Sequence, residues 1–199
     1  MPIGSGRETV AERVARGDYQ NSAEGGAIVP FSPDTDLSSI YPLMAAPSDG
    51  TYLASFLNGS WSMRQYLYRW DDGRLIFVVL RFDKKGERKK ILPLRCERLI
   101  GCLPKLSLRH LDNPRPLYNL HHLADRPDAP VIVVEGEKAA DAAAAIFPDY
   151  VCTTWIGGAQ SVGVAELLPL AGRSVTIWPD NDAEGVIAAE KLAARLMAN

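Results

Sequence analysis

The sequence contains few of the cysteine and histidine residues that stabilise small folds through disulfides or bound zinc. It contains three cysteines and three histidines. Cys96 and Cys102 are spaced more widely than the cysteine pairs of common zinc sites, and no second pair follows them. We therefore expect no zinc, and we expect reduced thiols, as is usual in the cytosol.

Long apolar stretches are also lacking. The N-terminal residues have no apolar core of the kind that a signal peptide needs. No run approaches the roughly 18 apolar residues of a membrane-spanning helix. The sequence therefore predicts a soluble, cytoplasmic protein that does not enter a membrane.

Neither sign of charge dominates, because the formal net charge is only -2. The distribution is nevertheless uneven: residues 61–115 contain 14 Lys and Arg against 6 Asp and Glu, whereas residues 131–199 contain 4 against 9. Such a division suggests a polyanion held by the basic segment and metal ions held by the acidic one. Two solvated surfaces that merely differ in charge are the simpler alternative.

Glycine and proline divide the chain into three parts. Residues 1–52 are expected to form a poorly structured N-terminal arm or linker, with one short helix over 7–16. Residues 53–130 are expected to form a smaller β-rich subdomain, because alternating apolar residues and two turn signals predict a meander over 61–94. The prolines of 95–130 allow only short helices there, one of them near 117–123.

Basic side chains gather around the second turn of this meander. They are Arg81, Lys84, Lys85, Arg88, Lys89 and Lys90. With Tyr66, Tyr68 and Trp70 nearby to stack on bases, these residues could bind a nucleic-acid backbone. Lysine and arginine at hairpin tips also protect against aggregation, so both interpretations stay open.

From residue 131 onward, apolar strands alternate with helices. Strands are expected at 131–134, 150–154 and 174–178, and helices over roughly 137–147, 160–169 and 183–197. Three such units imply a parallel sheet with right-handed crossovers. The runs at 131–134 and 175–178 are typical of strands buried on both faces. The sequence therefore predicts an α/β fold.

Acidic residues follow two of these strands. Glu135 comes directly after the first strand, and Asp180 and Asp182 follow the third. Ligands of parallel sheets bind beyond the carboxyl ends of the strands, and Mg²⁺ prefers carboxylate oxygens. The three residues are thus candidate catalytic residues and metal ligands. As alternatives, Glu135 could complement a helix N-terminus and Asp182 could cap a helix.

Four more residues could contact a nucleotide or a phosphate at the same edge of the sheet. Gly157 and Gly158 could offer backbone amides to phosphate oxygens. Lys138 could reach a phosphate or pair with Asp141 on its own helix. Gly185 could leave space for a phosphate or simply let its helix pack against the sheet.

Two motifs resemble a known family. Val-Glu-Gly-Glu-Lys at 134–138, followed by Pro-Asp-Asn-Asp-Ala-Glu-Gly at 179–185, resembles the Toprim domain of bacterial-type DNA primases, topoisomerases, recombination mediators and certain nucleases. The motifs are most similar to the primases and primase-helicases of phages and plasmids. The resemblance is strong over 131–199 and weaker over 61–130. It implies a Toprim-like parallel sheet with flanking helices, preceded by the smaller basic β-rich subdomain.

The resemblance also implies a function. Glu135, Asp180 and Asp182 would bind catalytic Mg²⁺, which Mn²⁺ can replace, while Lys138 and the basic segment would contact template or nucleotide. The implied activity is that of a DNA primase, a nucleotidyltransferase that makes RNA primers from NTPs on single-stranded DNA during replication of a phage or mobile element. A replicative helicase is the implied protein partner. A Toprim nuclease and a non-catalytic nucleic-acid-binding module are the alternatives.

Three parts of such primases have no counterpart in the sequence: the zinc module, a strand after the last helix, and the helicase module. We therefore expect the Toprim domain at 131–199 to be truncated at its C-terminus. A fragment of a longer protein and a reduced stand-alone version are both consistent with this, and either would limit independent primer synthesis.

Overall fold

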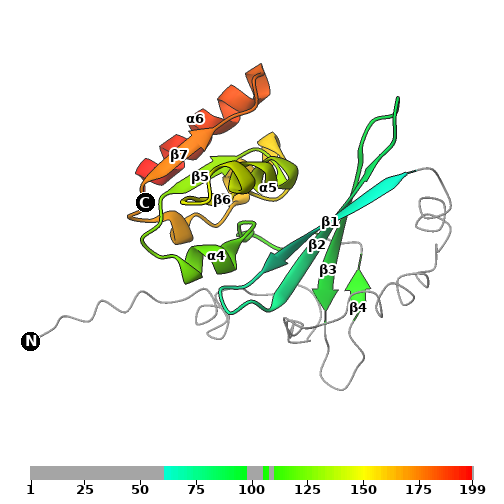
Figure 1. Ribbon diagram of the computed structural model, residues 1–199, viewed down its shortest axis with the longest axis horizontal. Helices are drawn as coiled ribbons and strands as arrows, with labels where there is room; N and C mark the ends of the chain where they lie inside the picture. Colours follow the sequence, from blue (N-terminus) through cyan, green and yellow to red (C-terminus); the bar gives the residue numbers. More distant parts are fainter. Residues whose placement is uncertain (1–60, 98–104, 108–109, 199) are drawn as a thin grey trace, which may run out of the picture.

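The computed structural model describes residues 61–97, 105–107 and 110–198, which form two sheets connected by a short helix (Figure 1). The predicted arm and its helix over 7–16 lie outside the described residues. Within the described part of the chain, no helix is long and apolar enough to cross a membrane.

The first sheet is a four-stranded antiparallel meander. Its strands are β1 (Ser62–Arg69), β2 (Leu75–Asp83), β3 (Lys90–Glu97) and β4 (Lys105–Ser107), in that order. The two turns fall where the sequence predicts them, and Gly73 and Gly86 there have φ angles of 83° and 82°, which glycine adopts without strain. The predicted hairpin strands are therefore confirmed, whereas β4 has no counterpart among the predictions.

The aromatic residues of β1 are part of the core and not of the surface. Tyr66, Tyr68 and Trp70 are 3%, 0% and 8% exposed. The ring centroids of Tyr68 and Tyr118 are 5.2 Å apart, and those of Tyr66 and Tyr118 are 6.1 Å apart. The expectation that these rings stack on bases is therefore wrong, because this face of the meander packs against the rest of the protein.

The second sheet is parallel, as predicted. The central strand β5 (Val131–Val134) lies between β6 (Val151–Thr153) and β7 (Val175–Trp178). The helices are α4 (Leu120–Asp125), which precedes the sheet, α5 (Glu137–Ile146), which follows β5, and α6 (Ala183–Met197), which follows β7. The predicted mixed α/β fold and two of the three helices expected after its strands, α5 and α6, are thereby confirmed.

The helix predicted over 160–169 is wrong. Two short 3-10 helices replace it, η2 (Ala159–Val164) and η3 (Leu168–Leu170). Ala165 between them has extended backbone angles, φ -70° and ψ 140°. Gly163 weakens an α-helix, and Pro169 lacks the N–H that would continue one, so the segment bends into two pieces.

The strand β7 is partly buried on one face and exposed on the other, which corrects the prediction that both faces are buried. All four residues of β5 are buried, but Thr176 and Trp178 in β7 are exposed, Trp178 by 53%. Within the described residues β7 pairs with β5 alone, so it forms an edge of the sheet. An edge strand next to solvent alternates between covered and exposed side chains.

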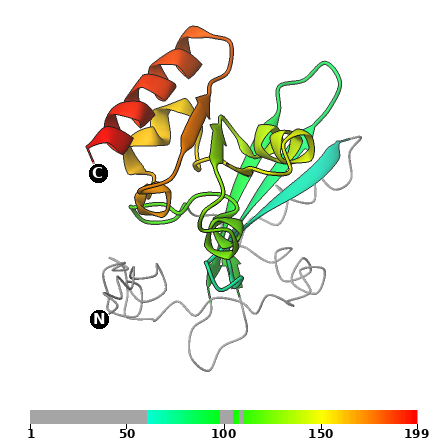
Figure 2. The same cartoon turned by 60° about the vertical axis from the view of Figure 1, so that its left-hand side comes forward.

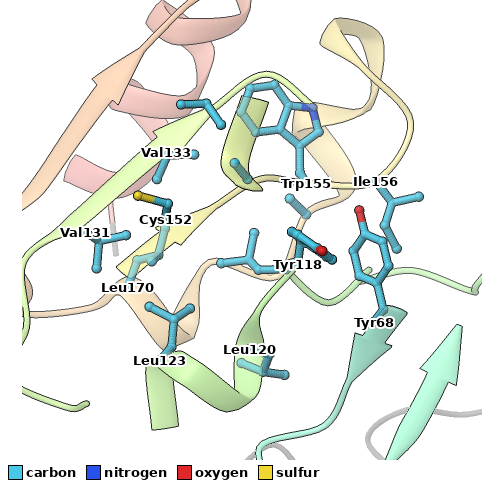
Figure 3. Close-up of a cluster of buried hydrophobic side chains, with 14 of the residues drawn as sticks. Tyr68, Tyr118, Leu120, Leu123, Val131, Val133, Cys152, Trp155, Ile156 and Leu170 are labelled. Carbon is cyan, nitrogen blue, oxygen red and sulfur yellow. The ribbon is translucent and has the colours of Figure 1, made fainter. Parts of the chain in front are cut away.

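One continuous core joins the two sheets. Figure 3 shows Tyr68 of β1 beside Tyr118 and Ile156, next to the apolar side chains that cover β5 and β6. The Tyr68 hydroxyl donates a hydrogen bond to Oε1 of Glu137 at 2.7 Å, which ties β1 to the first turn of α5. The domain boundaries at 52 and 130 remain predictions.

Candidate functional site

The order of the strands brings the predicted acidic residues together. Val134 of β5 lies opposite Trp178 of β7 in the parallel ladder, so the residues after both strands share one edge of the sheet. Burial raises the pKa of Glu135, and the negative charges of Asp180 and Asp182 raise it further. The three carboxylates are therefore within electrostatic reach of one another. The negative charge of Glu184, a residue that the sequence did not single out, also raises the pKa of Glu135.

Glu135 is partly buried and has a backbone partner. The N–H of Ala159 donates a hydrogen bond to its carboxylate, which lowers the pKa and partly offsets burial and the neighbouring charges. A carboxylate that is partly desolvated among like charges is stabilised by a cation. The position at the end of β5 is thus suited to a metal ligand.

Asp182 caps α6, as one alternative from the sequence proposed. Its Oδ1 accepts a hydrogen bond from the N–H of Gly185 at 2.7 Å, and its backbone is extended, with φ -144°. The cap engages one carboxylate oxygen. A structural role therefore explains Asp182 in part and leaves its second oxygen available to a ligand.

Asp180 has no comparable structural role. Its backbone carbonyl accepts a hydrogen bond from the N–H of Asp182 at 2.9 Å. Its side chain is exposed, and within the described residues the carboxylate makes no hydrogen bond and no ion pair. An exposed carboxylate placed beside Glu135 and Asp182 is electrostatically unfavourable unless something positive binds there.

Gly185 lets α6 approach the loop before it. A Cβ atom at this position would lie 2.5 Å from the backbone oxygen of Asp180. Gly185 is itself buried. The geometry therefore favours the packing interpretation of Gly185 over a direct phosphate contact.

Lys138 lies in the first turn of α5 with an exposed side chain. It forms no ion pair with Asp141, which instead accepts a hydrogen bond from the Tyr118 hydroxyl at 3.0 Å. A hydrogen bond from Arg81 is the main reason that the pKa of Asp83 is lowered, and the charge of Lys138 contributes. Lys138 thus lies near the end of β2 and remains able to reach a ligand.

The basic hairpin, residues 81–90 at the end of β2 and the start of β3, is partly neutralised. Arg81 pairs with Asp83, and Lys84 pairs with Glu87, both at 2.8 Å. The Nζ atoms of Lys90 and Lys84 lie 4.6 Å and 5.5 Å from the centroid of the Trp61 ring. This ring is the aromatic partner of the basic hairpin, in place of the buried tyrosines.

Three of the predicted basic residues stay available on this hairpin. Lys85, Arg88 and Lys89 are exposed and make no ion pair within the described residues. Two views show the loop between β2 and β3 pointing toward the same end of the molecule as the carboxyl ends of β5 and β7 (Figure 1, Figure 2). A strand of nucleic acid on the hairpin would therefore be directed toward the acidic edge.

Gly157 and Gly158 form the turn that follows β6. Both are exposed and have positive φ angles, 97° and 69°. The next residue, Ala159, is the one whose N–H reaches Glu135. The predicted phosphate turn and the predicted carboxylates therefore lie side by side.

Hard oxygen ligands at this edge match the preference of Mg²⁺ in kind. Within the described residues, however, no group of three or more His, Cys, Asp or Glu side chains is arranged to hold a metal ion. The Asp180 side chain is exposed and makes no hydrogen bond within the described residues, so it has room to rotate, whereas the cap holds Asp182 in place. Binding a cation would require the carboxylates to converge further than they do here.

Comparisons with known proteins give one family and one solved structure. A family model described as "Domain of unknown function (DUF6371)" matches residues 76–181. Among curated proteins, no match reaches significance. The chain is similar to a solved structure described as that of the DnaG catalytic core, with a TM-score of 0.41 and 16% identity over 83% of this chain and 51% of that one. The chain thus spans about half the length of that solved structure.

Proposed function

Because the chain belongs to the family described as "Domain of unknown function (DUF6371)", whose description names no activity, we propose a function from the site itself. The protein is a primase-type nucleotidyltransferase domain that joins ribonucleotides on a single-stranded DNA template in the replication of a phage or mobile element. The basic hairpin holds the template, and the acidic edge of the parallel sheet is the reaction site.

The carboxylate of Asp180 is the observation that carries this proposal. It is exposed, it has no partner within the described residues, and its charge raises the pKa of Glu135. Folding stability gives no reason to keep such a carboxylate beside two others. A site that binds a divalent cation and a polyphosphate does give one.

In this proposal Glu135, Asp180 and Asp182 would hold Mg²⁺, or Mn²⁺ in its place. When bound, the metal supplies positive charge to the leaving pyrophosphate and lowers the pKa of the attacking hydroxyl. The oxygen of a 3′-hydroxyl forms a bond to the α-phosphorus, its proton passes to the carboxylate of Glu135, and the bond from that phosphorus to the pyrophosphate breaks, so pyrophosphate leaves. Lys138 orients the phosphates, and the backbone around Gly157 and Gly158 lies against them.

Template-directed incorporation of labelled ribonucleotides tests this proposal. Asp180→Asn removes the charge of the unpartnered carboxylate and should lower incorporation about 100-fold or more. Glu190→Gln, which removes an exposed carboxylate elsewhere on α6, should leave incorporation unchanged. Equal incorporation by the wild type and by Asp180→Asn would show that the proposed site is wrong.

A nucleic-acid-binding module without catalysis is the second candidate. It is favoured by the finding that no group of side chains within the described residues is arranged to hold a metal ion. This candidate predicts binding of single strands with no incorporation under any metal condition. Incubation of labelled nucleic acid without nucleotides separates both proposals from a metal-dependent nuclease, which would cut the strand.

A further inference from the structure

Arg115 lies outside every motif that the sequence interpretation used, yet the fold holds it firmly. Its backbone N–H donates to the carbonyl of Val164, and its carbonyl accepts from the N–H of Glu166, both at 2.7 Å. Its Nε donates to the carbonyl of Leu111 at 3.2 Å. Backbone and side chain are thus anchored on both sides, which fixes the direction of the guanidinium group.

The guanidinium of Arg115 is directed at the Gly157-Gly158 turn. A Cβ atom built on Gly157 would lie 3.4 Å from Nη1 of Arg115 and 2.6 Å from Oγ of Ser161. The φ angle of +97° is a second reason for glycine at this position. Arg115 and Ser161 therefore line the turn from one side, and the missing side chain leaves them space.

These groups have donors to spare. Within the described residues, no hydrogen bond is formed by Nη1 or Nη2 of Arg115 or by the hydroxyl of Ser161. In the same part of the chain, the backbone N–H groups of Gly157 and Gly158 also donate to no partner. Side chain and backbone thus present several unused donors around one small turn.

The turn is rigid and adjoins the acidic edge. The indole Nε1 of Trp155 donates to the carbonyl of Gly158 at 2.8 Å, and the N–H of Ser161 donates to the same oxygen at 2.9 Å. The N–H of Ala159 reaches the carboxylate of Glu135. An anion bound at the turn would therefore lie directly next to the carboxylates.

We propose that Arg115, Ser161 and the Gly157-Gly158 turn form a binding site for the phosphates of a nucleoside triphosphate. The guanidinium is planar, permanently charged and geometrically matched to phosphate oxygens. Backbone N–H groups of a turn with positive φ angles form anion-binding concavities. This site rests on the proposed function, because the phosphates held here would belong to the incoming nucleotide at the acidic edge.

Direct binding measurements with inorganic tripolyphosphate, ATP and an oligodeoxythymidylate test the site, each with and without Mg²⁺. Arg115→Gln should bind tripolyphosphate and ATP about ten-fold more weakly or worse, and Ser161→Ala about three-fold more weakly. Arg115→Lys keeps the charge without the planar fork, so its affinity should lie between the wild type and Arg115→Gln. Lys191→Gln, an exposed charge removal on α6, is the matched control and should leave affinity unchanged.

Two results would overturn this site. One is unchanged tripolyphosphate affinity in both Arg115→Gln and Ser161→Ala. The other is a loss of affinity confined to the oligodeoxythymidylate, which would make Arg115 a template contact.

Thermal unfolding checks that each variant is folded. If Arg115→Gln does not fold, the affinity of Ser161→Ala decides. If the wild type binds triphosphate but never incorporates label, the proposed function is wrong and this site stands. If the wild type incorporates label while Arg115→Gln and Ser161→Ala bind triphosphate as tightly as it does, this site is wrong and the proposed function stands.

Discussion

At the scale of single residues, the three carboxylates of the acidic edge have different surroundings. Asp182 caps α6 with one oxygen, whereas the carboxylate of Asp180 makes no hydrogen bond or ion pair within the described residues. Glu135 is partly desolvated, and the charges of both aspartates raise its pKa. The different surroundings explain why removing each carboxylate should have a different effect on stability.

Glu135→Gln should stabilise the protein at neutral pH in the absence of divalent cations. Burial, and then the charges of Asp180 and Asp182, raise the pKa of Glu135 in the folded state. As the pH rises through the ordinary glutamate range, the unfolded chain releases this proton first, so the free energy of unfolding falls. The decrease is complete above the raised pKa of the folded state. The neutral glutamine avoids this loss.

Thermal unfolding in EDTA at acidic and neutral pH measures the effect. At neutral pH the melting temperature of Glu135→Gln should be about 1–3 °C above that of the wild type. At a pH below the ordinary glutamate range, the difference should disappear. A variant that is less stable than the wild type at neutral pH would refute this account of Glu135.

Gly185→Ala should destabilise the protein, although alanine is the better helix former. The added Cβ would lie 2.5 Å from the backbone oxygen of Asp180, so α6 or the preceding loop must shift, at a cost of about 1–3 kcal/mol. Gly163→Ala is the control, since a Cβ there would meet nothing within 4 Å. Urea unfolding compares the two, and equal stabilities would show that the close approach is unimportant.

The residues of the site differ in how far the sequence could reveal them. Glu135 follows one apolar strand directly, and Asp180 and Asp182 come within four residues of the end of another, so their placement at one sheet edge follows from local pattern and parallel topology. Arg115 reaches Gly157 only through tertiary packing, and no spacing in the sequence signals that contact. Local pattern therefore identifies the carboxylates and misses the guanidinium.

At the scale of elements, the basic hairpin is the part whose proposed function depends most on charge. Lys85→Gln, Arg88→Gln and Lys89→Gln together should weaken binding to single-stranded DNA, because each removes a contact to phosphate. The slope of log affinity against log salt should become shallower by about 2. Fluorescence anisotropy of a labelled oligonucleotide across salt concentrations measures this.

Lys191→Gln, a single exposed change on α6, is the control for this triple variant and should leave the salt dependence unaltered. Unchanged binding by the triple variant would mean that the hairpin charges only keep this end of the meander soluble. In that case the basic hairpin is the simpler solvated surface that the sequence also allowed.

The elements also show where pattern reasoning succeeds. The strand β5 and the helices α5 and α6 were predictable, because apolar runs and alanine-rich periodicity agree with the tertiary environment. The segment 160–169 was not, because Gly163 and Pro169 interrupt a pattern that is otherwise helical. The exposed face of β7 could not be predicted for another reason. The strand has the apolar composition of a central strand, but it lies at the edge of the sheet.

At the scale of the whole molecule, the two sheets should unfold together. Tyr68 of β1 is fully buried and donates to Glu137 of α5 at 2.7 Å, and its ring packs near that of Tyr118. Tyr68→Phe removes this hydrogen bond and should lower the free energy of unfolding by about 1–2 kcal/mol. Circular dichroism and tryptophan fluorescence should still report one shared transition.

Two separate transitions would contradict that prediction and would instead support the boundary predicted at residue 130. Parallel topology and the meander could each be predicted from local sequence. Their mutual packing could not, because the alternation of Tyr66, Tyr68 and Trp70 is equally consistent with a core face and with an exposed stacking surface. The tertiary contact decides between them.

The most direct test of the acidic site is a titration with Mn²⁺ followed by electron paramagnetic resonance, because bound and free Mn²⁺ give different signals. The wild type should bind Mn²⁺, and Glu135→Gln, Asp180→Asn and Asp182→Asn should each weaken binding about ten-fold or more. Asparagine at position 182 keeps a side-chain oxygen that can cap α6, so a weaker Mn²⁺ affinity of Asp182→Asn would report on the lost charge and not on a damaged helix. Unchanged affinity in all three variants would contradict the claim that these carboxylates form one cation site.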